Sequence, residues 1–464
     1  MTDLALRRRV RGWMMFDWAS QPFYTLCLTF VFGPYLAGVL ADAYAADGLS
    51  EAAADAAAQS LWSGAQTWIG VAIAVAAPVM GALADRAARR MPWIWAFSAA
   101  YVLGTAGLWL MVPDASQTTV ALVAFALAMI GAEMTTLYTN AMLPSLGPPS
   151  EVGRISGSGY ALGYAGGVAS LFVMLLLFAE NESGLTLLGN PPALGLDGAA
   201  REGTRFVGPF TALWFAVFMV PFFLWVREPQ AAMGGRASLR GAVRDVAALV
   251  RALPGRRSLM AFLLGSMLYR DALVALYAFG GVYARLVLDW TTVQIGLFGI
   301  VAAVTAAVAS WIGGRLDRRH GPKPVIAGAV LLLTGALLAI CFTDRTMVVG
   351  LPVAPGSGAP DLLLYVAGAV IGGAGGVVQA ASRTMMALHA NPARPTEAFG
   401  LYALSGKATA FLAPAMIWIG TEATGSARLG YLPVAGLFIV GLVLLAFVRP
   451  RGESETWSVQ PSSA

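Results

Sequence analysis

Residues 81–90 read GALADRAARR, and residues 313–323 read GGRLDRRHGPK. Both stretches follow a long apolar run, and both contain a small residue, then Asp-Arg, then further basic residues. A motif that recurs at matched places in a membrane chain indicates an internal repeat whose two copies are related by an axis along the membrane normal. We therefore expect two similar halves, each carrying this motif in the same loop.

The composition indicates that lipid is the solvent for much of this chain. Of its 464 residues, 58% are hydrophobic and 12% are charged, and the mean hydropathy is +0.70. Soluble domains carry about 25% charged residues. In lipid the backbone must satisfy its own hydrogen bonds in helices or closed barrels. The long apolar runs lack the period-two alternation of barrel strands, so the sequence predicts an all-α membrane protein.

Twelve apolar stretches are long enough to cross a bilayer, which takes about 20 residues. Six lie on each side of an arginine-rich segment at 227–257. We therefore predict an N-terminal six-helix half (1–226), a cytoplasmic linker (227–257), a C-terminal six-helix half (258–448) and a cytoplasmic tail (449–464). The predicted spans are 16–40, 61–84, 93–112, 118–143, 155–179, 206–226, 258–284, 291–313, 324–343, 361–387, 398–420 and 430–448.

The distribution of basic residues predicts the orientation of these spans. Of the 30 lysines and arginines, Arg270 and Lys407 fall deep within spans, and Arg383 is counted with the side at which its span ends. On one side of the membrane there are five, namely Arg201, Arg205, Arg285, Arg345 and Arg428. The rest lie on the other side, together with both termini, and loops rich in Lys and Arg stay in the cytoplasm. We predict a multi-pass protein of the inner (plasma) membrane with cytoplasmic termini, and read the net charge of +5 as loop charge, with no nucleic-acid partner.

The linker at 227–257 and the N-terminus each allow two interpretations. The linker is either a solvated connector that obeys the charge rule or a basic surface that lies on anionic lipid. Basic residues at 7–11 resemble the start of a signal peptide, but the following apolar run extends to about residue 40, too long for one. We interpret that run as an uncleaved first span.

The repeated loops have the chemistry of a breakable gate. Their aspartates can accept hydrogen bonds from a neighbouring helix N-terminus, where the helix dipole favours negative charge. Their arginines can pair with carboxylates on adjacent helices, and exposed pairs contribute only about 0–1 kcal/mol each. The alternative is two ordinary basic loops. The predicted gating residues are Gly81, Asp85, Arg86, Arg90, Gly314, Asp317 and Arg318.

The repeated loop resembles the signature loop of the major facilitator superfamily. The chain is further similar to the vacuole-effluxer-like family, known from autophagy-related amino-acid efflux, and it departs from that pattern at residues 20–22, Ser-Gln-Pro. The stretches that carry this resemblance are FDWAS (16–20), YTNAMLP (138–144), YALGYAGG (160–167), YRD (269–271), FGGVYA (279–284), QAASR (379–383) and FGLYALSGK (399–407).

Several polar residues lie at membrane depth, where ionisable groups usually face a cavity or a partner. The resemblance implies that spans one, four, seven and ten line a central cavity. We hypothesise that Glu133 and Arg270 contact solute or carry coupling, with Asp271 as another proton acceptor; the alternative is a fixed charge pair such as Asp271 with Lys407. The predicted substrate and coupling residues are Asp17, Glu133, Asn140, Arg270, Asp271, Gln379, Arg383 and Lys407.

Glycines at 159, 163 and 167, and at 372, 373, 375 and 376, are interpreted as helix-packing positions, because small residues let helices approach closely. Hydrolase, metalloprotease and nucleotide-binding motifs are missing from the sequence, so we predict no enzyme, no cofactor and no metal.

The sequence therefore predicts a monomeric secondary active transporter for a small polar or charged organic solute, amino-acid-like by preference, with a proton or another ion as the candidate coupling partner and lipid as its surroundings. Two alternatives stay open at this point. One is an exporter or flippase of lipid-like compounds on the same fold, and the other is a receptor or scaffold that does not transport.

Overall fold

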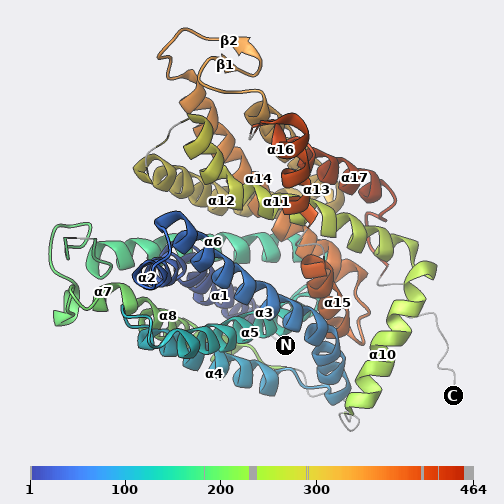
Figure 1. Ribbon diagram of the computed structural model, residues 1–464. Coiled ribbons are helices and arrows are strands. Elements are labelled where there is room, and N and C mark those ends of the chain that lie inside the picture. The colour runs from blue at the N-terminus through green and yellow to red at the C-terminus, as the bar shows by residue number, and fades with distance from the viewer. Residues whose placement is uncertain are drawn as a thin grey trace. The chain divides into compact units, whose positions relative to one another are not determined.

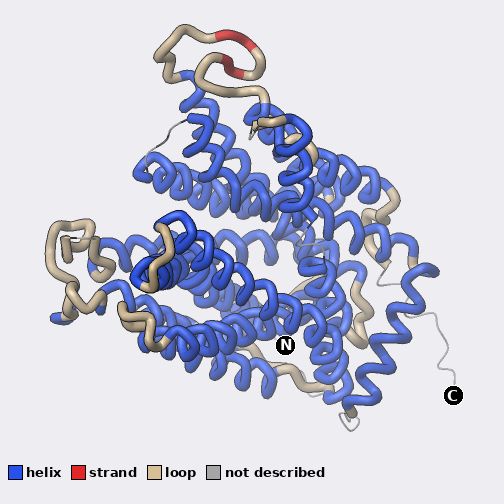
Figure 2. Tube along the Cα trace, in the orientation of Figure 1, coloured by secondary structure: helices blue, strands red, loops and turns tan. Residues whose placement is uncertain are grey.

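The computed structural model describes residues 3–181, 183–228, 238–288, 290, 292–408, 412–426 and 428–453. Helices make up most of these residues, which also include two short strands in one hairpin (Figure 2). The α-helices and strands are α1 (Asp3–Pro22), α2 (Phe32–Ala46), α3 (Glu51–Ala87), α4 (Met91–Gly107), α5 (Thr118–Met142), α6 (Pro149–Leu177), α7 (Glu202–Arg205), α8 (Val207–Phe218), α9 (Val220–Trp225), α10 (Leu239–Ala252), α11 (Arg257–Leu288), α12 (Thr292–His320), α13 (Pro322–Cys341), β1 (Met347–Val348), β2 (Leu351–Pro352), α14 (Ala359–His389), α15 (Pro395–Ala408), α16 (Leu412–Thr424) and α17 (Val434–Ala446). A π-helical segment, Phe23–Phe30, joins α1 to α2, and short 3-10 turns occupy Leu108–Leu110, Leu143–Ser145, Ala193–Gly195, Leu253–Gly255 and Leu429–Tyr431.

Eleven stretches among the described residues are helical, long and apolar enough to cross a membrane. They coincide with eleven of the twelve predicted spans. The remaining prediction, 398–420, contains α15 and α16, while residues 409–411 lie outside the described part of the chain. Eleven of the twelve predicted spans are therefore confirmed as helices of membrane-spanning length.

The chain packs as two compact units. Unit 1 comprises residues 1–76, 87–139 and 162–235, and unit 2 comprises residues 77–86, 140–161 and 236–464. Thus the end of α3 and the junction between α5 and α6, which come from the first half of the sequence, pack with the second half. The division into six-helix halves at 1–226 and 258–448 stays a prediction.

The core of unit 1 is aromatic. The ring of Tyr101 on α4 stacks on Phe215 of α8 with 4.0 Å between centroids, and Trp18 of α1 stacks on Trp214 at 5.6 Å. On α6, a Cβ atom added at Gly163 would lie 3.3 Å from the Asp17 carbonyl oxygen of α1. A Cβ atom at Gly167 would meet Thr25 and Gln21. The predicted packing role of these two glycines is therefore confirmed.

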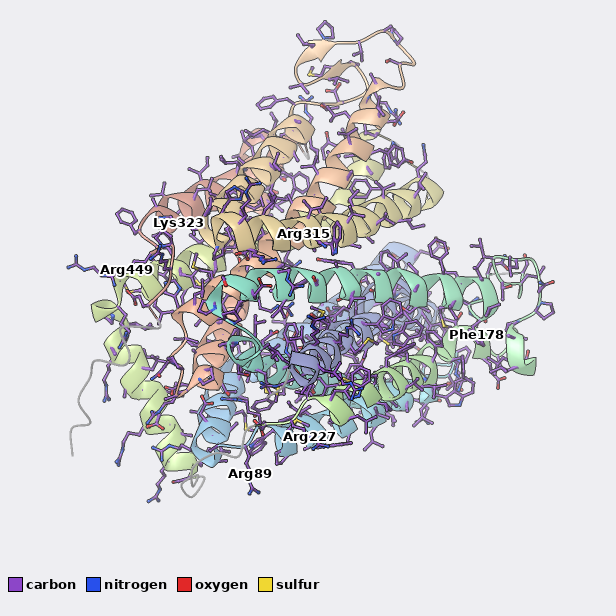
Figure 3. All side chains as sticks on the ribbon, turned by 180° about the vertical axis from the view of Figure 1, so that it is seen from behind. Arg89, Phe178, Arg227, Arg315, Lys323 and Arg449 are labelled. Atoms are coloured by element: carbon purple, nitrogen blue, oxygen red, sulfur yellow. The ribbon has the colours of Figure 1, made fainter. Side chains whose placement is uncertain are left out.

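In unit 2, helix α14 packs against α11, α12 and α13 (Figure 1). Its glycines make this possible, because a Cβ atom at Gly372 would collide with the backbone of Ala302 on α12. The C-terminal end of α17 is tied to α13, where the Lys323 ammonium donates to the carbonyl oxygens of Ala446 and Val448 at 2.8 Å each. Figure 3 shows Lys323 close to Arg449, which follows that helix.

Candidate functional site

The first copy of the repeated loop ends helix α3 and contacts the start of α15. The Asp85 carboxylate accepts a hydrogen bond from the backbone N–H of Glu397 at 2.8 Å. Glu397 lies in the first turn of α15, where N–H groups have no partner within the helix and the dipole favours an anion. A Cβ atom at Gly81 would lie 2.5 Å from the carbonyl oxygen of Thr396, so a glycine is needed for this approach. These contacts are of the type that the sequence predicted for this loop.

Arg86 of the same loop pairs with the linker helix α10. Its guanidinium donates to both oxygens of Asp245, with Nε to Oδ2 at 2.6 Å and Nη2 to Oδ1 at 3.0 Å. A second cation, Arg394, reaches Asp245 at 3.4 Å and Glu397 at 3.8 Å. Two arginines and three carboxylates, including Asp85, therefore form one network at this end of unit 2.

Burial in this network raises the pKa of Glu397 to about 7. The nearby charges act in both directions, since Arg394 and Arg86 lower this pKa while Asp245 and Asp85 raise it. Loss of hydration is the largest cause, because burial disfavours the charged form of a carboxyl group. The network therefore contains one acid that can change its protonation state near neutral pH.

The second copy of the loop ends helix α12 and packs on the start of α6. The backbone of Gly314 contacts Gly157, whose added Cβ atom would lie 2.5 Å from the Gly314 Cα. Asp317 is only 4% exposed and lies against Gly153, which leaves no room for a side chain there. Arg318 pairs with Glu151 at 2.7 Å. This copy therefore combines close backbone packing with an outer ion pair.

Arg90, the last predicted gating residue of the first loop, contacts a partner in unit 1. Its backbone N–H donates to the Glu228 carboxylate at 2.8 Å, and its guanidinium lies 3.9 Å from the same carboxylate. Its contacts therefore differ from those of Asp85 and Arg86, which bind α15 and α10 in unit 2.

Arg383 is almost fully buried, with 2% of its surface exposed. Its guanidinium donates to the Ser156 hydroxyl at 2.9 Å, to the Ser156 carbonyl at 2.7 Å and to the Asn140 side-chain oxygen at 3.3 Å. The Tyr160 ring lies 4.2 Å below its central carbon. A buried cation needs such partners, because an unpaired one is costly. The structure thus brings together two predicted site residues, Arg383 and Asn140, in a contact that joins α14 to the ends of α5 and α6.

Arg270 and Asp271 are neighbours on α11, and their side chains contact different helices. The Arg270 guanidinium lies 4.3 Å from the Tyr402 ring centre on α15, in cation–π geometry, and remains half-buried. The Asp271 carboxylate accepts from the backbone N–H of Ala413 on α16 at 3.0 Å. Together they place opposite charges against the two described helices of the eleventh predicted span.

The remaining predicted site residues lie on four different helices. Glu133 lies half-buried in the middle of α5 and Asp17 half-buried on α1, both in unit 1, while Gln379 lies half-buried on α14 in unit 2. The side chain of Lys407 lies outside the described residues, so its hypothesised pairing with Asp271 stays a prediction.

Sequence analysis missed the partners of the charged residues. They are Asp245, Glu228 and Glu151 for the loop arginines, the backbone N–H of Glu397 for Asp85, and Ser156 and Tyr160 for Arg383. One signal was available, because Asp245 is the single acid in the arginine-rich stretch 238–252. The other pairings join residues far apart in the chain, and no local sequence pattern predicts them.

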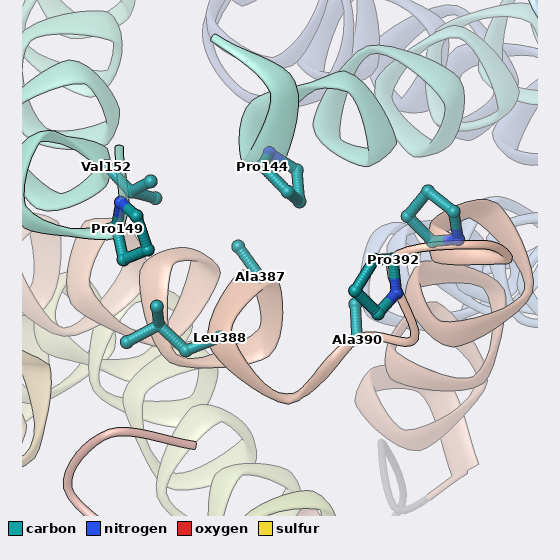
Figure 4. Close-up of a pocket in the computed structure, with 8 residues that line it drawn as sticks. Pro144, Pro149, Val152, Ala387, Leu388, Ala390 and Pro392 are labelled. Atoms are coloured by element: carbon teal, nitrogen blue, oxygen red, sulfur yellow. The ribbon is translucent and has the colours of Figure 1, made fainter. Parts of the chain in front are cut away.

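A small cavity of about 170 Å³ lies near these contacts in unit 2 (Figure 4). It is lined by Pro144, Pro149, Val152, Ala387, Leu388, Ala390, Pro392 and Pro395. Ligand pockets usually measure 300–1,000 Å³ and contain a few polar groups. We therefore do not assign a solute to this cavity.

Comparison with known families and proteins identifies relatives along most of the chain. Residues 148–455 match the family described as “Vacuole effluxer Atg22 like”. An uncharacterized MFS-type transporter of Bacillus subtilis, YxiO, is 23% identical over 447 residues, or 95% of each chain. Autophagy-related protein 22-2 of Neosartorya fischeri is 24% identical over 318 residues, which cover 64% of this chain and 49% of that relative. The chain thus aligns with about half the length of that fungal protein.

Solved structures with the same architecture include two transporters. The human organic anion transporter MFSD10 (TETRAN) aligns with a TM-score of 0.70 at 17% identity, covering 96% of this chain and all of that one. The proton:xylose symporter XylE aligns with a TM-score of 0.69 at 11% identity over 98% of each chain. At such identities the likeness shows the fold alone. The predicted all-α fold of the major facilitator type is confirmed.

Proposed function

Since the chain belongs to the Atg22-like vacuole effluxer family and is a major facilitator transporter rather than an enzyme, we propose that it moves a small organic solute with a carboxylate group, amino-acid-like in character, by alternating access. Arg270 carries this proposal. It is a half-buried guanidinium near the middle of a predicted span, held on one face by the Tyr402 ring. Guanidinium groups bind carboxylates through paired hydrogen bonds.

The contrast between two arginines supports this assignment. Arg383 is enclosed by Ser156, Asn140 and Tyr160 and is 2% exposed, so we assign it to positioning α14. Arg270 keeps accessible surface. Two proteins of the same fold, an organic anion transporter and a proton symporter, agree with an anionic solute and with proton coupling.

For coupling we propose Asp271 and Glu133 as the proton-carrying groups. Asp271 accepts a hydrogen bond from the Ala413 N–H on α16, and protonation of its carboxylate would weaken that contact. Such a link would let a proton change the packing between α11 and α16. Glu133 occupies the middle of α5 in unit 1.

The proposal includes the topology. Both termini and both repeated loops lie on the cytoplasmic side, because only five basic residues fall in loops on the other side. A single chain with halves at 1–226 and 258–448 would work as a monomer. Opening towards the cytoplasm would require the contacts of Asp85, Arg86, Asp317 and Arg318 to break.

Transport by the purified protein in proteoliposomes tests the proposal. A panel of radiolabelled amino acids, a sugar and a neutral amino alcohol is compared with and without a pH gradient. We expect a carboxylate-bearing solute to be transported, Arg270→Ala to lose this transport, and Arg270→Lys to retain part of it. Arg319→Gln, which removes an exposed arginine from the last turn of α12, is the matched control. Equal transport by wild type and Arg270→Ala would exclude Arg270 as the carboxylate ligand.

The coupling role is tested separately with Glu133→Gln and Asp271→Asn. We expect one of them to retain exchange of labelled for unlabelled solute but to lose accumulation driven by a pH gradient, because exchange needs no net proton movement. If both variants still accumulate solute with an unchanged pH dependence, neither residue carries the proton.

A further inference from the structure

The linker helix α10 has three distinct faces. At 100° per residue, Leu239, Val243, Val246 and Val250 fall within a stripe about 60° wide. Three of these side chains are exposed, Leu239 by 63%, Val243 by 50% and Val250 by 46%. An apolar stripe left exposed on a helix marks an interaction surface.

Arginines form a second row directly beside this stripe. Arg240, Arg244 and Arg251 fall within about 40° of one another and begin about 60° from Val243 around the helix. All three are exposed, and within the described parts of the chain none of them makes an ion pair. The row therefore presents three positive charges outwards along one edge of the apolar stripe.

The third face fastens α10 to the rest of unit 2. Asp245 accepts the two hydrogen bonds from Arg86, and Arg394 lies 3.4 Å away. A Cβ atom at Gly241 would lie 2.5 Å from the Arg86 guanidinium. Because Arg86 ends the predicted second span and Arg394 precedes the eleventh, these contacts hold α10 at the level where the spans leave the membrane.

We propose that α10 binds the surface of the membrane at this end, with the apolar stripe among the lipid chains and the arginine row on the phosphates of anionic phospholipids. The three faces meet the requirements of an interfacial helix, which buries an apolar face and keeps basic residues at the level of the headgroups. Arginines close to an anionic surface contribute about 1 kcal/mol each to membrane binding. Their methylene groups can lie along the lipid acyl chains while the guanidinium groups reach the phosphates.

The anionic bilayer suits this surface better than a soluble partner. The exposed apolar side chains lie on a helix that is attached through Asp245 to the ends of two predicted spans, so a bilayer around those spans would be close to the stripe. The positive row is complementary to the net negative charge of an anionic lipid surface, which a zwitterionic surface lacks. This inference concerns the linker and does not depend on which solute is transported.

Fluorescence quenching by brominated lipid tests the placement. A bimane label is attached to Val243→Cys, on the apolar stripe, or to Ala248→Cys, which is exposed and lies about 140° away around the helix. The full-length protein is placed in nanodiscs of phosphatidylcholine containing either brominated phosphatidylglycerol or brominated phosphatidylcholine. Cys27 and Cys341 are buried and serve as the unlabelled background.

We expect quenching at position 243 and little at position 248, with brominated phosphatidylglycerol more effective than brominated phosphatidylcholine. Arg240→Gln/Arg244→Gln/Arg251→Gln should reduce this preference for anionic lipid by about tenfold or more. The matched control Arg89→Gln/Arg319→Gln/Arg451→Gln removes the same charge from exposed positions outside α10 and should leave the preference unchanged.

Three outcomes would overturn the proposal. Equal quenching at both positions would mean that α10 has no lipid-facing side. Absence of quenching at both would place the stripe against water or a protein partner. An equal loss of preference in the two triple variants would show that net charge, rather than the arginine row, attracts the lipid. Thermal unfolding of each variant separates these outcomes from loss of the fold.

Discussion

The two copies of the repeated loop contain the same residue types but bind their partners differently. In the first copy, Asp85 accepts a backbone hydrogen bond from α15, and Arg86 forms a two-bonded pair with Asp245 of the linker helix. In the second copy, Asp317 is buried against Gly153, and its neighbour Arg318 is 53% exposed beside Glu151. A repeated motif thus preserves a position in the fold, while the partner helix decides whether the aspartate accepts a backbone hydrogen bond or is buried against a glycine.

Both copies share a close backbone approach at a glycine, and its loss should give the largest effect. Gly157→Ala would place a Cβ atom 2.5 Å from the Gly314 Cα and 2.6 Å from the Ser310 carbonyl oxygen. Overpacking of this kind costs about 1–3 kcal/mol, so the thermal unfolding midpoint in detergent should fall. The control Gly335→Ala has open space around it. If Gly81→Ala destabilises as much as Gly157→Ala, both copies depend on backbone contact, whereas a much smaller effect would restrict this dependence to the second copy.

The ion pair of the first copy should give the next largest effect. Arg86 and Asp245 are 32% and 13% exposed, so their pairing should be worth about 1 kcal/mol, the upper end for pairs near a surface. The measurement is a double-mutant cycle with Arg86→Gln and Asp245→Asn, read as thermal stability. Arg89→Gln, an exposed neighbour, should change little. Additive effects in the cycle would show that the two side chains do not stabilise each other.

The first copy should also respond to pH through Glu397. Its pKa in the folded protein is about 7, above its ordinary value of 4.5. Between these values the folded protein binds more protons than the unfolded chain, so stability should fall as pH rises from about 4.5 to 7. Glu397→Gln should remove this part of the pH dependence, as measured by thermal unfolding across that range. Parallel curves for wild type and variant would assign the pH response to other groups.

The ion pair of the second copy should give the smallest effect. Arg318 is 53% exposed and meets Glu151 at 2.7 Å, so Arg318→Gln should cost less than about 0.5 kcal/mol. High salt should abolish even this difference, because solvent-exposed charges are screened. A large loss of stability that persists in high salt would mean that Arg318 contributes through packing. The difference in ion-pair strength between the two copies would then disappear.

The sequence predicted the membrane spans and the repeated loops well, because both are local patterns. Apolar runs of about 20 residues identify a span without knowledge of its neighbours, and eleven of the twelve predictions coincide with described helices. The packing role of Gly163 and Gly167 was equally accessible, since their spacing by four places them on one helix face.

The contacts of the charged side chains were predictable only in kind. The sequence suggested that Asp85 would meet a helix N-terminus, but it could not identify α15, which lies more than 300 residues away. It included Arg383 among the substrate and coupling residues, and the structure surrounds Arg383 with Ser156, Asn140 and Tyr160. Solute binding by Arg383 stays a prediction, and its present contacts favour a positioning role.

For this protein, the sequence by itself determined that the chain is a membrane protein. It also determined where the spans lie and that one motif occurs twice. These properties follow from hydrophobicity and from repetition along the chain. Only the tertiary structure decided that Arg86 binds the linker helix, that Asp317 is buried beneath a glycine and that Arg270 and Asp271 contact different helices. These contacts join residues that are far apart in the sequence. The preferences of a short stretch of chain therefore cannot predict them.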